Sequence, residues 1–379
     1  MKKADKILCK KSSPLSALIM CRPNLRGFFQ SKCLEYIIVN LLKLVLNKKE
    51  VFCLGKLKSQ WGESYLIVLP YSTFQMRGKS LTQRQEIVLS ALKLAQSLNA
   101  EKISFAGLLP SLLNHFKDLP DSYLDYKNKI TNGHIITCLG IALLFEKIIQ
   151  KTSCQVLAFV GLGSIGRLSL SLLLEKVVTP QKLIFCDLRK KQNELETLAE
   201  KIKSQYKMPI QICYYDEKSF LELYSADFIL GAVSSKFILD PNLLQKGTVL
   251  IDDSFPPILS VSKSIKRMKE KQDVLILSGG KLASDELKFS TYSFLLPNFF
   301  ISFFIKQMGA GALPGCWLEA LIEAQNLFTD QTYEDENHKL LRVWQKKEKE
   351  NLKVSSLHFS KYKISTLLEK KVYQIRETR

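Results

Sequence analysis

Three glycines within six residues follow an apolar run over residues 155–160 and precede a helix-like stretch. A strand that ends in such a turn and leads into a helix directs backbone N–H groups and the positive end of the helix dipole to one point, which suits a pyrophosphate. The turn therefore predicts a dinucleotide site, with a tight strand–helix connection that holds no ligand as the alternative. The residues of the turn expected to contact the ligand are Gly161, Gly163, Ser164, Ile165 and Gly166.

An acidic residue and a basic run follow the next apolar segment. Asp187 ends this segment about 20 residues after the turn, where an acid typically accepts hydrogen bonds from ribose hydroxyls. An acid here repels a 2′-phosphate and favours NADH, whereas Arg189 could bind that phosphate. The basic run over residues 189–191 favours NADPH, and NADH stays open.

Regular alternation of apolar and helical segments begins at residue 155. Segments rich in Val, Ile, Leu and Phe, separated by helical or loop stretches, predict an α/β fold with a doubly wound parallel (Rossmann) sheet. The predicted strands are 155–160, 183–187, 209–214, 227–233, 248–252 and 273–277. Since ligands bind beyond the carboxyl ends of such strands, we expect Val233 and Ser234 to contact the cofactor and Gly279 and Gly280 to contact the substrate.

Changes in composition divide the chain into five parts. A second, smaller α/β domain is predicted before the Rossmann domain, with a long helix over 134–150 as the connector. The parts are a basic N-terminal extension (1–50), a substrate domain with the connector helix (51–150), the Rossmann domain (151–290), a closing segment (291–330) and a basic C-terminal tail (331–379).

Charge and cysteine content indicate which partners and which cellular compartment we expect for the protein. The net charge of +19 favours anionic partners of any kind. Nine cysteines without a CxxC pair indicate reduced thiols in a cytoplasmic protein and predict neither disulfides nor a metal site. No run reaches the roughly 18 apolar residues of a membrane span. The aromatic residues over 292–305 could belong to the core, line an acyl-chain channel or form a peripheral membrane contact. The basic tail lacks interleaved aromatic residues, so no nucleic-acid partner is expected, and the oligomeric state stays open.

Short blocks in a fixed order over residues 65–325 give a further signal. They include Ile103-Ser-Phe-Ala-Gly107, Ile130-Thr-Asn-Gly-His134, Leu239-Asp-Pro241, Val274-Leu-Ile-Leu-Ser-Gly-Gly280 and Gly315-Cys-Trp-Leu-Glu-Ala-Leu321. With the glycine turn, this order resembles the cyanobacterial acyl-[acyl carrier protein] reductases that form fatty aldehydes. The resemblance implies NADPH-dependent reduction of an acyl thioester, carried by acyl carrier protein or coenzyme A, through an enzyme-bound thioester. That family lacks an acid at the end of the second strand, so Asp187 is a departure.

The resemblance implies that Cys316 is the nucleophile. A position in the first turn of a helix after Pro314 would stabilise a thiolate, whereas a small buried core residue is the alternative. The resemblance also brings Ser111 and Asn114 near the substrate, with helix capping as the alternative for both. His134 could donate a proton or act as a polar helix cap.

Two other functions compete with thioester reduction. One is a dehydrogenase of the shikimate or amino-acid type, in which hydride moves to a small carbonyl without a covalent step. The other is a non-catalytic dinucleotide sensor.

Overall fold

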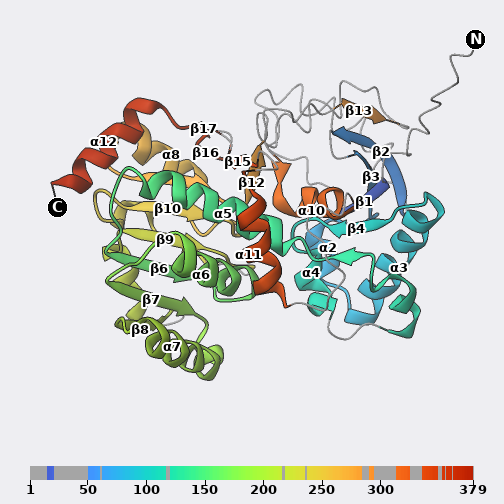
Figure 1. Cartoon of the computed structure of the whole chain (residues 1–379), viewed down its shortest axis with the longest axis horizontal. Helices are drawn as coiled ribbons and strands as arrows, with labels where there is room; N and C mark the ends of the chain where they lie inside the picture. Colours follow the sequence, from blue (N-terminus) through green and yellow to red (C-terminus); the bar gives the residue numbers. More distant parts are fainter. Residues whose placement is uncertain are drawn as a thin grey trace, which may run out of the picture.

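The computed structural model describes residues 15–20, 50–59, 62–116, 120–215, 218–234, 237–283, 290–293, 313–324, 335–348, 352–354, 356–360 and 362–378. Two six-stranded sheets lie side by side, with helices α5, α10 and α11 between them (Figure 1). No helix of the described ranges is long and apolar enough to cross a membrane. The aromatic stretch predicted to touch a membrane lies outside these ranges, except at residues 292–293.

The sheet built from the middle of the chain is parallel throughout and has the strand order β11-β10-β9-β6-β7-β8. Its strands are β6 (Val156–Val160), β7 (Lys182–Asp187), β8 (Ile210–Tyr214), β9 (Phe228–Gly231), β10 (Val249–Asp252) and β11 (Leu275–Ser278). The chain starts in the centre, winds out to one edge, returns and winds out to the other, which is the doubly wound order. The predicted Rossmann fold is thereby confirmed.

Helices cover both faces of this sheet (Figure 1). They are α5 (His134–Ile149), α6 (Ser164–Lys176), α7 (Gln192–Tyr206) and α8 (Val261–Glu270), with the short 3-10 helices η3 (Arg189–Lys191), η4 (Lys218–Ser225) and η5 (Pro241–Leu243). Helix α5 is apolar around its whole circumference, so it is buried on nearly every side. This burial fixes its N-terminus between the two sheets.

The other sheet has the order β13-β2-β3-β1-β4-β5. Its strands are β1 (Leu15–Met20), β2 (Phe52–Ser59), β3 (Gly62–Val68), β4 (Lys102–Phe105), β5 (Ile130–Thr131) and β13 (Ser290–Ser293). Its helices are α2 (Thr73–Arg77), α3 (Leu81–Ser97), α4 (Leu109–Leu112), η1 (Asn114–Phe116) and η2 (Asp121–Tyr126). Strand β1 is buried and pairs in parallel with both β3 and β4. The prediction that residues 1–50 form an extension is therefore wrong at residues 15–20, whose apolar side chains form the middle of a sheet.

The C-terminal part of the chain is integrated into the structure. Its elements are β12 (Lys281–Ala283), β14 (Leu313–Pro314), α10 (Gly315–Ala324), α11 (Glu336–Lys346), β15 (Lys353–Val354), β16 (His358–Phe359), β17 (Tyr362–Lys363) and α12 (Thr366–Glu377). Strand β15 pairs with β12, and α11 packs against α5 and α6. The prediction of a basic tail over 331–379 is wrong for the helices α11 and α12, because Leu340, Val343 and Val372 are buried in the core.

Candidate functional site

A cavity of about 810 Å³ lies at the carboxyl edge of the Rossmann sheet and extends to the other sheet. It brings together eleven residues that the sequence predicts as site residues. These are Ser111, Asn114, His134, Gly163, Ser164, Ile165, Val233, Ser234, Gly279, Gly280 and Cys316. Gly161, Gly166, Asp187 and Arg189 do not line it. Segments far apart in the sequence thus share one space.

The glycine turn fits a dinucleotide phosphate. Gly161 has φ +88°, and a Cβ there would lie 2.5 Å from the Ala232 carbonyl oxygen. A Cβ on Gly166 would overlap the carbonyl oxygen of Gly161, so this glycine lets α6 approach the turn. A Cβ on Gly163 meets nothing within 4 Å, because this position opens onto the cavity. Since no side chain caps the N-terminus of α6, its first N–H groups suit an anion.

Asp187 supports the turn from behind. One of its carboxylate oxygens accepts hydrogen bonds from the Leu162 N–H (2.9 Å) and the Lys191 ammonium (3.0 Å), and the other accepts from the Leu188 N–H (2.8 Å). The side chain is almost fully buried. The expected exposed acceptor for ribose is therefore replaced by a structural carboxylate that Lys191 neutralises. Arg189 lies over the Tyr214 ring, with 4.8 Å from the guanidinium carbon to the ring centroid.

Asp253 and Lys281 are two titratable groups that line the cavity, together with Asp252. Burial and the charge of Asp252 raise the pKa of Asp253 to about 8. Burial also lowers the pKa of Lys281 to about 8, although the charge of Asp253 opposes this shift. Both groups line the cavity, and the Asp253 carboxylate lies against Gly280. Groups that titrate near neutral pH in a cleft are suited to proton transfer.

Sequence reasoning listed neither residue of this pair as a site residue. Asp253 follows β10 and Lys281 follows the Gly279–Gly280 turn after β11, so both stand at strand ends of the predicted sheet. Their position was the available signal. Their shifted pKa values could not be predicted from the sequence, because these shifts depend on burial by other segments.

Cys316 lines the cavity at the start of α10, and its surroundings disfavour the thiolate. Burial raises its pKa to about 12, and the charges of Asp253 and Glu319 act in the same direction. A hydrogen bond with the Gly107 backbone opposes this only in part. The prediction of a thiolate nucleophile conflicts with this environment, because a thiol at such a pKa stays protonated at neutral pH.

Glu319, three residues after Cys316, has a structural role at the start of α5. Its buried carboxylate accepts hydrogen bonds from Gly133 N–H (3.0 Å), Ile136 N–H (3.0 Å) and the Thr131 hydroxyl. Burial raises the pKa of Glu319. This carboxylate caps the N-terminus of α5 and thereby holds the cavity wall in place.

His134 starts α5 but does not cap it. Its backbone N–H donates to Asn132 Oδ1 (3.0 Å), so Asn132 and Glu319 together satisfy N–H groups at the start of α5. The His134 ring is buried, 5.3 Å from the His115 ring and 3.5 Å from the Glu336 carboxylate. The predicted roles of His134, Ser111 and Asn114 stay predictions, with each residue at the cavity wall.

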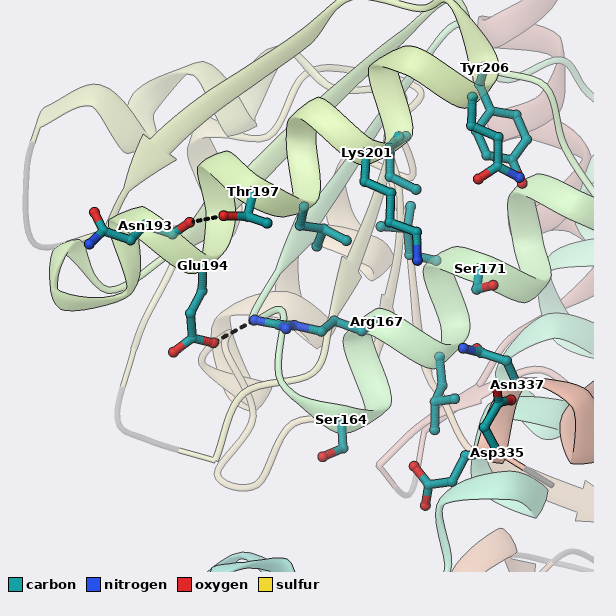
Figure 2. Close-up of a pocket in the computed structure, with 16 residues that line it drawn as sticks. Ser164, Arg167, Ser171, Asn193, Glu194, Thr197, Lys201, Tyr206, Asp335 and Asn337 are labelled. Atoms are coloured by element: carbon teal, nitrogen blue, oxygen red, sulfur yellow. Dashed lines mark hydrogen bonds and ion pairs between the residues drawn. The ribbon is translucent and has the colours of Figure 1, made fainter. Parts of the chain in front are cut away.

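A second cavity of about 790 Å³ lies between α6, α7 and the start of α11 (Figure 2). Arg167 of α6 pairs with Glu194 of α7 across it, at 2.6 Å. Ser164 lines both cavities, but Asp253 and Lys281 line only the first. The proton-transfer groups therefore distinguish the first cavity as the candidate site.

Comparison with known proteins identifies no family for the chain. No family model matches, and no curated protein matches. Among solved structures, L-tryptophan dehydrogenase from Nostoc punctiforme matches at 13% identity and TM-score 0.39, over 96% of this chain and 88% of that one. Quinate dehydrogenase from Corynebacterium glutamicum in complex with NAD matches at 13% identity and TM-score 0.38, over 88% and 99%. Δ1-pyrroline-2-carboxylate reductase from Thermococcus litoralis, in complex with NADH and L-proline, matches over 36% of this chain but only 42% of its own length, at 12% identity and TM-score 0.29.

The predicted membership of the acyl-[acyl carrier protein] reductases is wrong. The matching structures are dehydrogenases and a pyrroline-carboxylate reductase, and no family model supports the block order on which the resemblance depended. Thioester reduction through Cys316 is corrected with it, since the protonated thiol argues independently against a covalent step. The expected partners, acyl carrier protein and coenzyme A thioesters, were implied by the same resemblance and stay predictions.

Proposed function

We propose that the protein is an NAD(P)-dependent oxidoreductase that transfers hydride to a small carbonyl or imine compound without a covalent intermediate. The observation that carries this proposal is the meeting of Asp253, Lys281 and the glycine turn in one cavity. Hydride transfer to a carbonyl leaves negative charge on oxygen, so the reaction needs a proton donor near the cofactor. Lys281, with its pKa at about 8, suits that task.

A nicotinamide dinucleotide, when bound, supplies the hydride. Gly163, Ser164 and Ile165 would hold its pyrophosphate, and Val233 and Ser234 would line the path toward the reacting end. Lys190 and Lys191 also line the cavity, and Lys191 neutralises Asp187. Because Lys191 compensates the charge of the acid, a 2′-phosphate meets the Lys190 ammonium and no free carboxylate. We therefore retain NADPH as the proposed cofactor over NADH.

The remaining residues orient and protonate the substrate. The Lys281 ammonium gives its proton to the carbonyl oxygen as the carbon–oxygen double bond becomes a single bond, and the neutral amine is then reprotonated from the cavity. Asp253, protonated over much of the neutral range, can return that proton. Ser111 and Asn114 face the same space and offer hydrogen bonds to polar groups of the substrate.

The first test is NADPH and NADH oxidation by the purified protein with a panel of small 2-oxo acids, cyclic imines and ring ketones. Lys281→Met should lower kcat by about 100-fold or more, in the range typical for loss of a general acid. Binding of NADPH, followed by its fluorescence, should be unchanged. Full turnover in Lys281→Met would exclude this residue as the proton donor, and lack of oxidation across the panel with both cofactors would exclude the proposed function.

A further inference from the structure

His358 contacts the proposed proton donor from a distant part of the chain. Its Nε2 lies 2.9 Å from Lys281 Nζ, and its Nδ1 lies 2.8 Å from the Ser356 carbonyl oxygen. A carbonyl oxygen can only accept, so Nδ1 carries the ring proton and Nε2 is left as an acceptor. The geometry therefore has the Lys281 ammonium donating to a neutral imidazole.

The segment that carries His358 contacts the strands that lie before and after Lys281 in the sequence. Strand β15 pairs with β12, which begins at Lys281, and β16 packs against β11. The Ser360 N–H donates to Ser278 Oγ at 3.0 Å. The imidazole is thus held against the amine by backbone contacts, and its position does not depend on one flexible side chain.

We propose that His358 is a positioning residue that holds the Lys281 ammonium toward the cavity, so that strands β15 and β16 complete the active site. The contact stands on its own, and its catalytic meaning rests on the proposed function. A neutral acceptor favours the charged amine, and the charge of Asp253 also favours it. Burial and the charge of Lys281 both lower the pKa of His358, which keeps the imidazole neutral at neutral pH.

The test uses two amide variants of the full-length protein. In His358→Gln the side-chain oxygen reaches the place of Nε2 and can still accept from Lys281. In His358→Asn the shorter amide reproduces only the Nδ1 contact with Ser356. The pKa of Lys281 is measured by its rate of acetylation with acetic anhydride across pH, read by mass spectrometry, and the alkaline limb of kcat is measured in parallel.

We expect the pKa of Lys281 to fall by about 1 unit in His358→Asn, since a hydrogen bond to a charged group is lost, and to stay near the wild-type value in His358→Gln. The alkaline limb of kcat should move down by the same amount in His358→Asn only, with the KM for cofactor unchanged. His338→Gln, at an exposed histidine of α11, is the control for a general effect of losing an imidazole.

Equal Lys281 pKa values in wild type and His358→Asn would overturn the inference, whatever the turnover. A shifted pKa in a protein that oxidises neither nicotinamide cofactor would instead leave the His358–Lys281 contact standing and remove the proposed function. Thermal melting of each variant separates a shifted pKa from loss of the fold.

Discussion

Asp253 and Lys281 reach similar pKa values from opposite directions, and burial is the main cause for both. The charged forms of both groups are poorly solvated in the cavity wall, which raises the pKa of the acid and lowers the pKa of the amine. Near neutral pH, the protonated and deprotonated forms of each group therefore lie close in free energy. This property belongs to the pair and would be lost if either side chain were exposed.

This burial makes folding stability depend on pH. The folded-state pKa of Asp253 is raised to about 8 from 3.8, so the unfolded chain ionises first as pH rises. Its contribution to stability is therefore greatest below pH 4 and is lost as pH rises toward about 8. Asp253→Asn removes that loss, and its melting temperature should fall less than that of wild type between pH 5 and pH 8 in scanning calorimetry. Parallel curves for the two proteins would contradict a buried, protonated Asp253.

Cys316 offers a sharp test against covalent catalysis. Cys316→Ala keeps the Cβ that packs against Gly133 and removes only the sulfur. Because the thiol stays protonated at neutral pH, kcat/KM with the best substrate of the panel should stay within about twofold of wild type. A loss of about 100-fold or more would return the thiol to the reaction.

Two glycines in the turn between β6 and α6 have different roles, one in cofactor binding and the other in folding. Gly163→Ala adds a methyl group to the open cavity and should weaken NADPH binding by about tenfold at an unchanged melting temperature. Gly166→Ala pushes a methyl group into the Gly161 carbonyl and should lower the free energy of unfolding by about 2 kcal/mol. Fluorescence titration and denaturant unfolding measure the two effects. Equal effects of both substitutions on binding and stability would contradict this division.

Local sequence signals were sufficient for elements that follow one another in the chain. The Rossmann strands are continuous apolar runs, and each glycine acts within its own turn, so the doubly wound sheet and most cavity residues could be predicted. Strands β12, β15 and β16 are two or three residues long, and only tertiary contacts define them. The same limit hid Lys281 and His358, which lie 77 positions apart. The structural role of Asp187 could not be predicted for the same reason, because the N–H of Leu162, which binds its carboxylate, is brought close only by the fold.

At the scale of the whole molecule, helix α12 joins segments that lie far apart in the sequence. Arg376 of α12 donates to Thr152 Oγ1 (2.8 Å), Gly247 O (3.1 Å) and the Ser153 carbonyl, and lies 3.6 Å from the Asp227 carboxylate. Its side chain is almost completely buried. Three separate segments at the amino end of the Rossmann sheet therefore depend on one guanidinium.

Loss of this guanidinium should destabilise the fold. Arg376→Ala removes the donor to the carbonyls of Asp227 and Gly247 and the ion-pair partner of the Asp227 carboxylate, and we expect a loss of about 3 kcal/mol in the free energy of unfolding. Lys370→Ala, at an exposed position of the same helix, should change stability by less than about 0.5 kcal/mol. Urea unfolding of both variants checks this, and similar losses would mean that α12 acts through helix propensity alone.

The position of Arg376 also bears on how the protein is made. Residues 152, 153, 227 and 247 leave the ribosome more than a hundred positions before the side chain that joins them. Until α12 docks, the amino end of the sheet lacks its clamp, and a chain released early keeps that edge accessible to proteases. Resistance to proteolysis at this edge therefore reports that α12 has been translated and has docked.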